Sequence, residues 1–313
     1  MTTQKIIIDA APGQDDAIGL LVALGSSDEL ELLGVTVVEC RVPLKAALHN
    51  TRRVCELAGR HDIGIFAGCD RPLIREPASL QRPGVDTGLD GFEAPCPDVP
   101  VQGLHAADFI IETLRNEEPS SVTLCCFGPL TNIATALQRA PDIAPRIREI
   151  VMMAGSRCAT GILSPVAEQN AWIDPEALQL VLDSDVSCTL LPLDIAHQLV
   201  ASPPRLAALR AIGTKPAKAA AAWADVLTRP YHETFGAEGM PLHSPPVIAY
   251  LLRPYLFMGR HVNVQIETRS ELTRGMSVID WWGITPRKPN ALVMSHVEAN
   301  GVFSLLNEMI AQL

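Results

Sequence analysis

Two adjacent carboxylates, Asp15 and Asp16, stand just after the first apolar run of the chain. That run, residues 6–8, leads through the turn pair Pro12 and Gly13 to the acids, which open a predicted helix. Adjacent like charges repel each other, and Asp favours a helix only in its first turn. Carboxylates in this position are suited to bind a metal ion or the hydroxyls of a sugar. Simple capping of the helix is the alternative role of the pair.

The rest of the chain alternates short apolar runs with longer amphipathic stretches. This pattern is typical of a parallel sheet buried between helices, so the predicted fold class is α/β, with a mainly parallel central sheet flanked by helices. The predicted strands are residues 5–9, 32–39, 63–66, 122–127, 150–153 and 187–191. The predicted helices are residues 15–24, 44–57, 106–115, 130–138, 175–182 and 216–228. Ligands of such sheets bind beyond the carboxyl ends of the strands, so we expect the site in the loops that follow residues 9, 39, 127 and 153.

Two stretches rich in Pro, Gly or small residues, 69–101 and 154–166, predict long loops of the kind that carry function. Residues 262–267 and 276–280 alternate in hydropathy and predict a small C-terminal β-hairpin. The sequence shows no internal repeat, and we expect a single domain over residues 1–313.

The composition of the chain argues against a nucleic-acid-binding protein and against a membrane protein. Hydrophobic residues make up 48% of the chain and charged residues 19%, and the net charge is −10. A chain of this charge without a basic stripe is not expected to bind nucleic acid. No apolar run is long enough for a membrane span, and the first residues do not resemble a secretory signal, so we expect a cytoplasmic protein. The eight cysteines show no metal-binding spacing, and packing is their simplest role.

Several segments, in order, resemble the signature of the calcium-dependent nucleoside hydrolases. Residues 9–16, DAAPGQDD, are similar to that family's DxDPGxDD. Similar matches occur at residues 127–132 (FGPLTN), 152–155 (MMAG), 165–177 (PVAEQNAWIDPEA) and 241–245 (PLHSP). The resemblance covers nearly the whole chain. It implies the nucleoside hydrolase fold and hydrolysis of an N-glycosidic bond, in purine or pyrimidine salvage.

The resemblance also implies roles for residues that this chain retains. In the family, a calcium ion holds the sugar diol and the attacking water. Asp15 corresponds to the acid that holds ribose, and Asp16 to a calcium ligand, as does the backbone carbonyl of Phe127. His243 corresponds to a histidine near the leaving base. Asp15, Asp16 and His243 are therefore the candidate catalytic residues.

Candidate sugar-binding residues lie in the 165–177 segment. Glu168 and Asn170 correspond to residues that hold the sugar hydroxyls. Trp172 is a candidate to stack on the base or the sugar, with ordinary packing as its alternative role.

Other positions depart from the family pattern. Ala11 replaces the aspartate that both ligates calcium and takes the proton from water, and Ser244 replaces a further calcium-ligating aspartate. Arg41 and Ile162 stand where asparagines contact the sugar. Gly84 takes the place of a histidine that often precedes the Thr-Gly-Leu-Asp-Gly loop.

These departures change the expected cofactor. Asp16, one carbonyl and a serine hydroxyl offer fewer oxygens than the roughly six to eight that calcium takes, so we expect weak calcium binding or none. Arg41 brings a positive charge to the same loops, and a guanidinium can pair with a carboxylate or a phosphate. We therefore expect Arg41 to face the pocket and to contact Asp15, Asp16 or an anionic ligand. The alternative is an arginine that points to solvent.

The leading hypothesis is a hydrolase of a nucleoside-like N-glycosidic bond, with an eroded calcium site and an altered substrate. Without an acid at position 11, Asp15 or Asp16 has to activate the water. The alternative hypothesis is a nucleoside- or sugar-binding protein without turnover. The expected partner is a small nucleoside or related glycoside, and the resemblance suggests a homodimer or homotetramer. The leaving base is not identified by the sequence.

Overall fold

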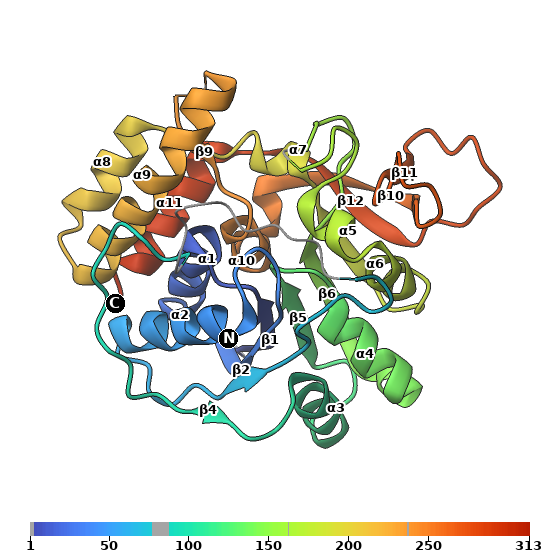
Figure 1. The fold of residues 1–313 in the computed structure, drawn as a ribbon, viewed down its shortest axis with the longest axis horizontal. Helices are drawn as coiled ribbons and strands as arrows, with labels where there is room; N and C mark the ends of the chain where they lie inside the picture. Colours follow the sequence, from blue (N-terminus) through green and yellow to red (C-terminus); the bar gives the residue numbers. More distant parts are fainter. Residues whose placement is uncertain (1–2, 77–87, 162, 237) are drawn as a thin grey trace.

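A mainly parallel β-sheet forms the centre of the molecule (Figure 1). The structure, a computed structural model, describes residues 3–76, 88–161, 163–236 and 238–313. Within these ranges the sheet has ten strands in the order β11-β10-β12-β7-β6-β5-β1-β2-β3-β4. Its strands are β1 (Gln4–Ala10), β2 (Leu30–Val37), β3 (Ile65–Ala67), β4 (Val101–Gln102), β5 (Val122–Cys126), β6 (Ile147–Met153), β7 (Cys188–Leu191), β10 (Phe257–Ile266), β11 (Ser277–Asp280) and β12 (Ala291–Val297). A separate pair joins β8 (Val200–Ala201) and β9 (Met240–Pro241).

Helices cover both faces of the sheet, as the alternating pattern predicts. One face packs against α1 (Gln14–Leu24), α2 (Leu44–Leu57), α7 (Leu193–Ala196), α8 (Pro203–Ala211), α9 (Lys215–Phe235), α10 (Pro245–Leu252) and α11 (Ala299–Ile310). The other face packs against α3 (Ala106–Asn116), α4 (Thr131–Arg139) and α6 (Pro175–Leu182). The short helix α5 (Gln169–Ile173) precedes α6, and two 3-10 turns are η1 (Pro141–Arg146) and η2 (Pro254–Leu256).

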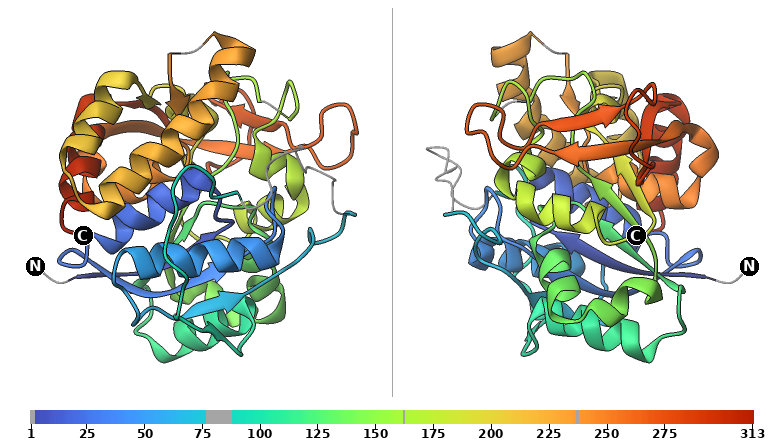
Figure 2. Two further views of the ribbon diagram at one scale, coloured as in Figure 1. Left: turned by 60° about the vertical axis from the view of Figure 1, so that its left-hand side comes forward. Right: turned by 90° about the vertical axis from the view of Figure 1, so that its right-hand side faces the viewer.

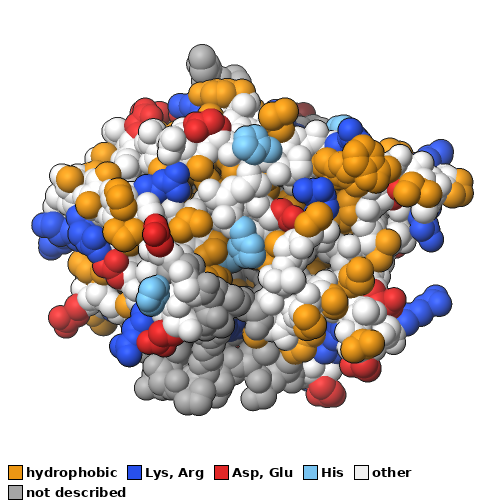
Figure 3. Space-filling view, turned by 90° about the horizontal axis from the view of Figure 1, so that it is seen from above, with side chains coloured by type: hydrophobic (Ala, Val, Ile, Leu, Met, Phe, Trp, Pro, Cys, Tyr) orange, Lys and Arg blue, Asp and Glu red, His pale blue; other side chains and the backbone are white. Residues whose placement is uncertain are grey.

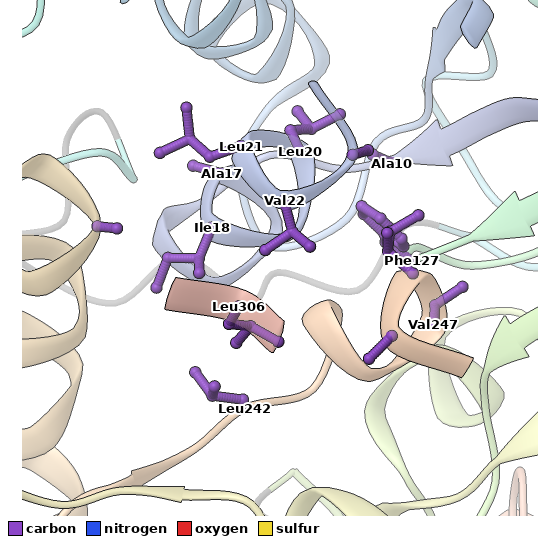
Figure 4. Close-up of a cluster of buried hydrophobic side chains, with 14 of the residues drawn as sticks. Ala10, Ala17, Ile18, Leu20, Leu21, Val22, Phe127, Leu242, Val247 and Leu306 are labelled. Carbon is purple, nitrogen blue, oxygen red and sulfur yellow. The ribbon is translucent and has the colours of Figure 1, made fainter. Parts of the chain in front are cut away.

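Strand β1 shows why the sheet needs two apolar layers. Ile6 and Ile8 belong to the core under α1, whereas Ile7 belongs to the core under α3 and α4. Successive side chains of a strand point to opposite faces, so a central parallel strand has to be apolar on both. Figure 4 shows the first of these cores, where Ile18 and Val22 of α1 lie near Leu306 of α11.

The predicted C-terminal hairpin is confirmed, because β10 pairs antiparallel with β11. It is also joined to the main sheet: β10 runs antiparallel to β12, and β12 runs parallel to β7. In Figure 2 the orange and red C-terminal strands lie at the opposite end of the sheet from the blue and cyan ones. Of the helices in the described ranges, none has the length and hydropathy that a membrane span requires.

Helix α9 differs most from its predicted range. The prediction, residues 216–228, ends two residues before Pro230, and proline inside a helix usually kinks or ends it. The structure continues the helix to Phe235, where Gly236 ends it in the left-handed conformation with φ of 65°. A single proline therefore does not end this 21-residue helix.

Candidate functional site

The candidate site begins where β1 ends and α1 starts. Gly13 is the N-cap residue of α1, and Asp15 and Asp16 lie in its first turn. The positive end of the helix dipole favours acids at this position. The site therefore lies at the carboxyl edge of the sheet, beside its central strand, as the sequence predicts.

The acid pair meets a segment from the far end of the sequence, just before α10. Asp15 accepts hydrogen bonds from the backbone N–H groups of His243 (3.1 Å) and Ser244 (2.7 Å). Asp16 accepts one from the Ser244 hydroxyl and another, of 2.8 Å, from the backbone N–H of Ala11. Residues 11 and 244, which stand where the family pattern has calcium-ligating aspartates, thus both donate to Asp16.

Burial dominates the electrostatics of the pair. It raises the pKa of Asp15 above its ordinary value, against the hydrogen bonds from residues 243 and 244. Burial, with the neighbouring charge of Asp15, raises the pKa of Asp16 to about 6. Each carboxyl is therefore easier to protonate here than in water.

Helix α5 brings two more predicted residues to the carboxyl ends of β5 and β6. Glu168 is the N-cap of α5 and accepts hydrogen bonds from the backbone N–H groups of Asn170 (2.7 Å), Ala171 (3.1 Å) and Gly155 (3.2 Å). Burial raises its pKa to about 7. The hydrogen bond from Gly155 ties the Glu168 side chain to the loop that follows β6.

Asn170 connects two strand ends. Its side-chain Nδ2 donates to the backbone carbonyl of Phe127 (2.8 Å) and to that of Met153 (2.9 Å). The Phe127 carbonyl, the predicted metal ligand, thus already accepts a hydrogen bond from the protein.

His243 lies beside Asp15. Its Nδ1 is 4.0 Å from Asp15 Oδ1, and its ring centroid is 6.4 Å from that of Tyr231. Burial and the positive charge of Arg41 lower the pKa of His243 to about 4. The imidazole is therefore neutral at neutral pH.

Arg41 lies in the loop between β2 and α2 and is half-buried. Its Nη1 donates to Gln169 Oε1 at 3.4 Å, and Gln169 Nε2 donates to Cys40 Sγ at 3.4 Å. Among ion pairs between described residues, none joins Arg41 to Asp15 or Asp16. Because Arg41 is half-buried and donates to Gln169, a wholly solvent-directed side chain does not describe it.

Other predicted residues are less closely tied to this cluster. The guanidinium carbon of Arg274 lies 4.6 Å from the centroid of the Trp172 ring, so one partner of that ring is a cation of the protein. A substrate contact for Trp172 stays a prediction. Ile162 and Gly84 lie outside the described residues.

Asp9 and Gln169 are site residues that the sequence analysis missed. Asp9 is 1% exposed, and its Oδ1 accepts hydrogen bonds from Thr36 Oγ1 (2.6 Å) and Asn132 Nδ2 (2.8 Å). Its Oδ2 has no hydrogen-bond partner among the described residues, and burial raises its pKa to about 7. A charged residue inside an otherwise apolar strand was the available signal for Asp9. Gln169 offered no such signal.

Comparison with known proteins identifies the family of the chain. The family model described as "Inosine-uridine preferring nucleoside hydrolase" matches residues 6–304. The chain is 44% identical over 309 residues to the uncharacterized protein C1683.06c of Schizosaccharomyces pombe, covering 99% of each. It is 36% identical to the pyrimidine-specific ribonucleoside hydrolase RihA of Shewanella woodyi, covering 98% of each. A purine-preferring ribonucleoside hydrolase from Gardnerella vaginalis superimposes with a TM-score of 0.91 at 25% identity, covering 98% of each chain.

The likeness in sequence and in structure extends over the same residues that build the sheet and the site. The nucleoside hydrolase fold predicted from the sequence is thereby confirmed. The chain belongs to the inosine-uridine preferring nucleoside hydrolase family, and it is a hydrolase.

Proposed function

We propose that the chain hydrolyses the N-glycosidic bond of a nucleoside-like substrate at the cluster of Asp15, Asp16 and His243. The observation that carries this proposal is the pair of hydrogen bonds from the backbone of residues 243 and 244 to Asp15. They hold a helix-terminal acid pair and a neutral histidine together at the carboxyl edge of the sheet. That edge is where parallel sheets bind their ligands.

In the reaction, water adds to the anomeric carbon, the carbon–nitrogen bond breaks, and one water proton passes by way of a carboxylate and the solvent to the departing nitrogen, leaving a free base and a sugar. Asp15 or Asp16 takes that proton, because Ala11 has no carboxylate and a general base has to lie within hydrogen-bond reach. His243 lies beside the leaving base. Glu168 and Asn170, which are fixed by the loop after β6, bind the sugar hydroxyls.

The residues present do not fit a calcium ion. Calcium takes about six to eight oxygen ligands, and carboxylates are the strongest of them. Here the Ser244 hydroxyl and the Ala11 N–H both donate to Asp16, and the Phe127 carbonyl accepts from Asn170. Within the described ranges, no group of three or more His, Cys, Asp or Glu side chains has the geometry to hold a metal. These contacts support a reaction without a metal.

A small ligand is favoured over a polyanion. In the face seen in Figure 3, acidic, basic and histidine side chains are mixed with apolar ones. Among the side chains coloured there, a continuous basic stripe of the kind that polyanions require is not visible.

A second candidate function is binding of a nucleoside or sugar without turnover. It is favoured by Asp16, because both of its oxygens already accept hydrogen bonds from the protein. A carboxylate engaged in this way has fewer lone pairs left to accept a proton from water.

Release of free base from uridine and inosine in the presence of a chelator tests the proposal. The two substrates follow the pyrimidine-specific and purine-preferring relatives. We expect turnover about 10²–10⁴-fold slower than that of a relative with an intact acid at position 11. Asp15→Asn and Asp16→Asn should abolish it, and Arg139→Asn, at an exposed ion pair, should not. Ligand binding with no base release would select the second candidate, and a calcium requirement would contradict the first.

A further inference from the structure

The loop that follows β6 is held by two neighbouring residues at the start of α7. Asp194 accepts hydrogen bonds from two consecutive backbone N–H groups of this loop, that of Arg157 at Oδ2 (2.7 Å) and that of Cys158 at Oδ1 (2.9 Å). The backbone N–H of Leu193 donates to the Gly155 carbonyl at 2.9 Å. Because both oxygens of one carboxylate are used, Asp194 fixes the orientation of the loop as well as its distance from α7.

Helix α7 is itself anchored on the sheet. Ile195 and Ala196 are buried in the core. Gln198, just after the helix, donates through Nε2 to the backbone carbonyl of Ser295 (3.1 Å) and accepts through Oε1 from the backbone N–H of Val297 (3.2 Å). Both partners lie on β12, so a segment that Asp194 binds is tied to the sheet through α7.

The same loop reaches the candidate sugar-binding acid. Two of the backbone N–H groups that donate to Glu168 belong to α5, whereas that of Gly155 (3.2 Å) comes from the loop. The end of the loop also packs against the residue before Glu168, since a Cβ built on Gly161 would overlap the Ala167 carbonyl oxygen. A displacement of the loop would therefore be transmitted to Glu168.

A second attachment joins the loop to the C-terminal hairpin. The guanidinium carbon of Arg157 lies 4.9 Å from the centroid of the Trp281 ring. Arg157 is exposed, and a cation–π contact at an exposed site stabilises less than two hydrogen bonds to a carboxylate do. Asp194 is therefore the stronger of these two attachments.

We propose that Asp194 is a positioning residue for the sugar site: it holds the loop whose Gly155 donates to Glu168, and thereby sets the affinity of the site for the sugar. The inference rests on the proposed function, since it names a residue that acts through Glu168 in that site. An acid suits this role because its two oxygens accept both N–H groups. An amide has one oxygen, and its NH2 group would face the second N–H.

Base release from uridine and inosine tests the inference. We expect Asp194→Asn to raise KM about 5- to 50-fold with a much smaller change in kcat, because a residue that holds the sugar contributes to binding in the ground state and the transition state alike. A merely structural loss would lower kcat with the amount of folded protein and leave KM unchanged. The matched control is Asp142→Asn, which removes an exposed carboxylate that also accepts two hydrogen bonds, both from Arg115, and should leave KM unchanged.

A double-mutant cycle with Glu168→Gln decides whether Asp194 acts through Glu168. If it does, adding Asp194→Asn to Glu168→Gln should raise KM further by less than about 2-fold. Additive effects of the two substitutions, or equal KM values for Asp194→Asn and Asp142→Asn, would overturn the inference. If thermal unfolding shows that Asp194→Asn does not fold, Asp194→Glu takes its place in the cycle. It keeps both oxygens and the charge, moves them by one methylene, and should raise KM by a smaller factor.

Failure of the proposed function gives a different result. Calorimetric titration with uridine and inosine measures Kd in place of KM. Binding to the unmodified chain without base release would contradict the proposed hydrolysis, while the same variants would still test the role of Asp194 through Kd. Absence of both binding and base release would contradict the proposed function and the inference together.

Discussion

At the scale of single residues, Asp16 is held by the Ser244 hydroxyl and by the backbone N–H of position 11, a donor that any residue but proline would supply there. Both positions donate hydrogen bonds to this carboxylate. A cation needs lone pairs directed at it, so a carboxylate surrounded by donors suits the metal-free state.

The first prediction concerns calcium. Excess calcium and excess chelator should give nearly the same melting temperature, because two acidic ligands are absent. Ala11→Asp combined with Ser244→Asp should create a calcium-dependent rise, since a ligand at 1,000 times its Kd adds about 4 kcal/mol. Differential scanning fluorimetry measures both.

The combined variant Ala11→Asn and Ser244→Asn is the control for this experiment, because asparagine has the shape of aspartate but carries no charge. A large calcium-dependent rise in the unmodified chain would show that the donor set described above does bind the ion.

A second prediction concerns Asn170. Its side chain satisfies two carbonyls, those of Phe127 and Met153, and it is 5% exposed. Asn170→Ala leaves both carbonyls without this donor and should lower the free energy of unfolding by about 2–4 kcal/mol. Chemical denaturation measures the loss. The control Asn300→Ala, at an exposed position, should change the free energy of unfolding by less than about 1 kcal/mol. Equal losses in the two variants would show that the two carbonyls do not depend on Asn170.

At the scale of elements, the loop after β6 connects the site to the C-terminal hairpin. The backbone N–H of Ser156 donates to Ser277 Oγ on β11 at 3.4 Å, and that of Gly155 donates to Glu168. Gly155 has φ of 75°, and a Cβ built there would lie 2.7 Å from Ser277 Oγ.

Gly155→Ala should therefore destabilise the chain and displace Glu168. Its matched control is Gly213→Ala, which has φ of 86° and no atom within 4 Å of the added Cβ. Both variants carry the cost of about 1 kcal/mol for a positive φ, but only Gly155→Ala adds a steric conflict. We expect it to be less stable than the control by a further ~1–2 kcal/mol in denaturant unfolding. Equal losses would mean that Ser277 moves aside freely.

Sequence patterns predicted the elements with clear local signals. The ranges of α2 and α6 match the structure, because amphipathic spacing and an initial proline mark their ends. Strand β12 was missed, since its apolar run is short and contains Ser295 and His296. The acid pair and the edge of the sheet were predicted from the residues themselves, but the roles of residues 168, 170 and 243 came only through resemblance, because periodicity does not show that residue 15 meets residue 244. The Gln169 contact joins a loop residue to the first residue of α5, and no local pattern encodes such a contact.

At the scale of the whole molecule, the buried acids make stability depend on pH. Burial raises the pKa of Glu168 from its ordinary value of 4.5 to about 7. The folded protein therefore binds this proton more tightly than the unfolded chain does. The resulting stabilisation is complete below pH 4.5 and is lost as the pH rises through about 7.

Replacing Glu168 by Gln, which is neutral, should weaken this dependence of the free energy of unfolding on pH. Between pH 5 and 8 the free energy of unfolding of the unmodified chain should fall by about 1–3 kcal/mol more than that of Glu168→Gln. Urea denaturation at several pH values measures this. Glu298→Gln is the matched control, because Glu298 caps α11 in the same way but is exposed. Identical slopes for all three proteins would contradict the prediction.

The contact between Asp15 and Ser244 joins positions 229 residues apart in the chain. During synthesis, the acid pair therefore leaves the ribosome long before the segment that donates to it. A nascent chain that has not reached residue 244 has β1 and α1 but neither of the backbone donors that hold Asp15. On the proposed mechanism, base release therefore requires a chain that has been synthesised beyond residue 244.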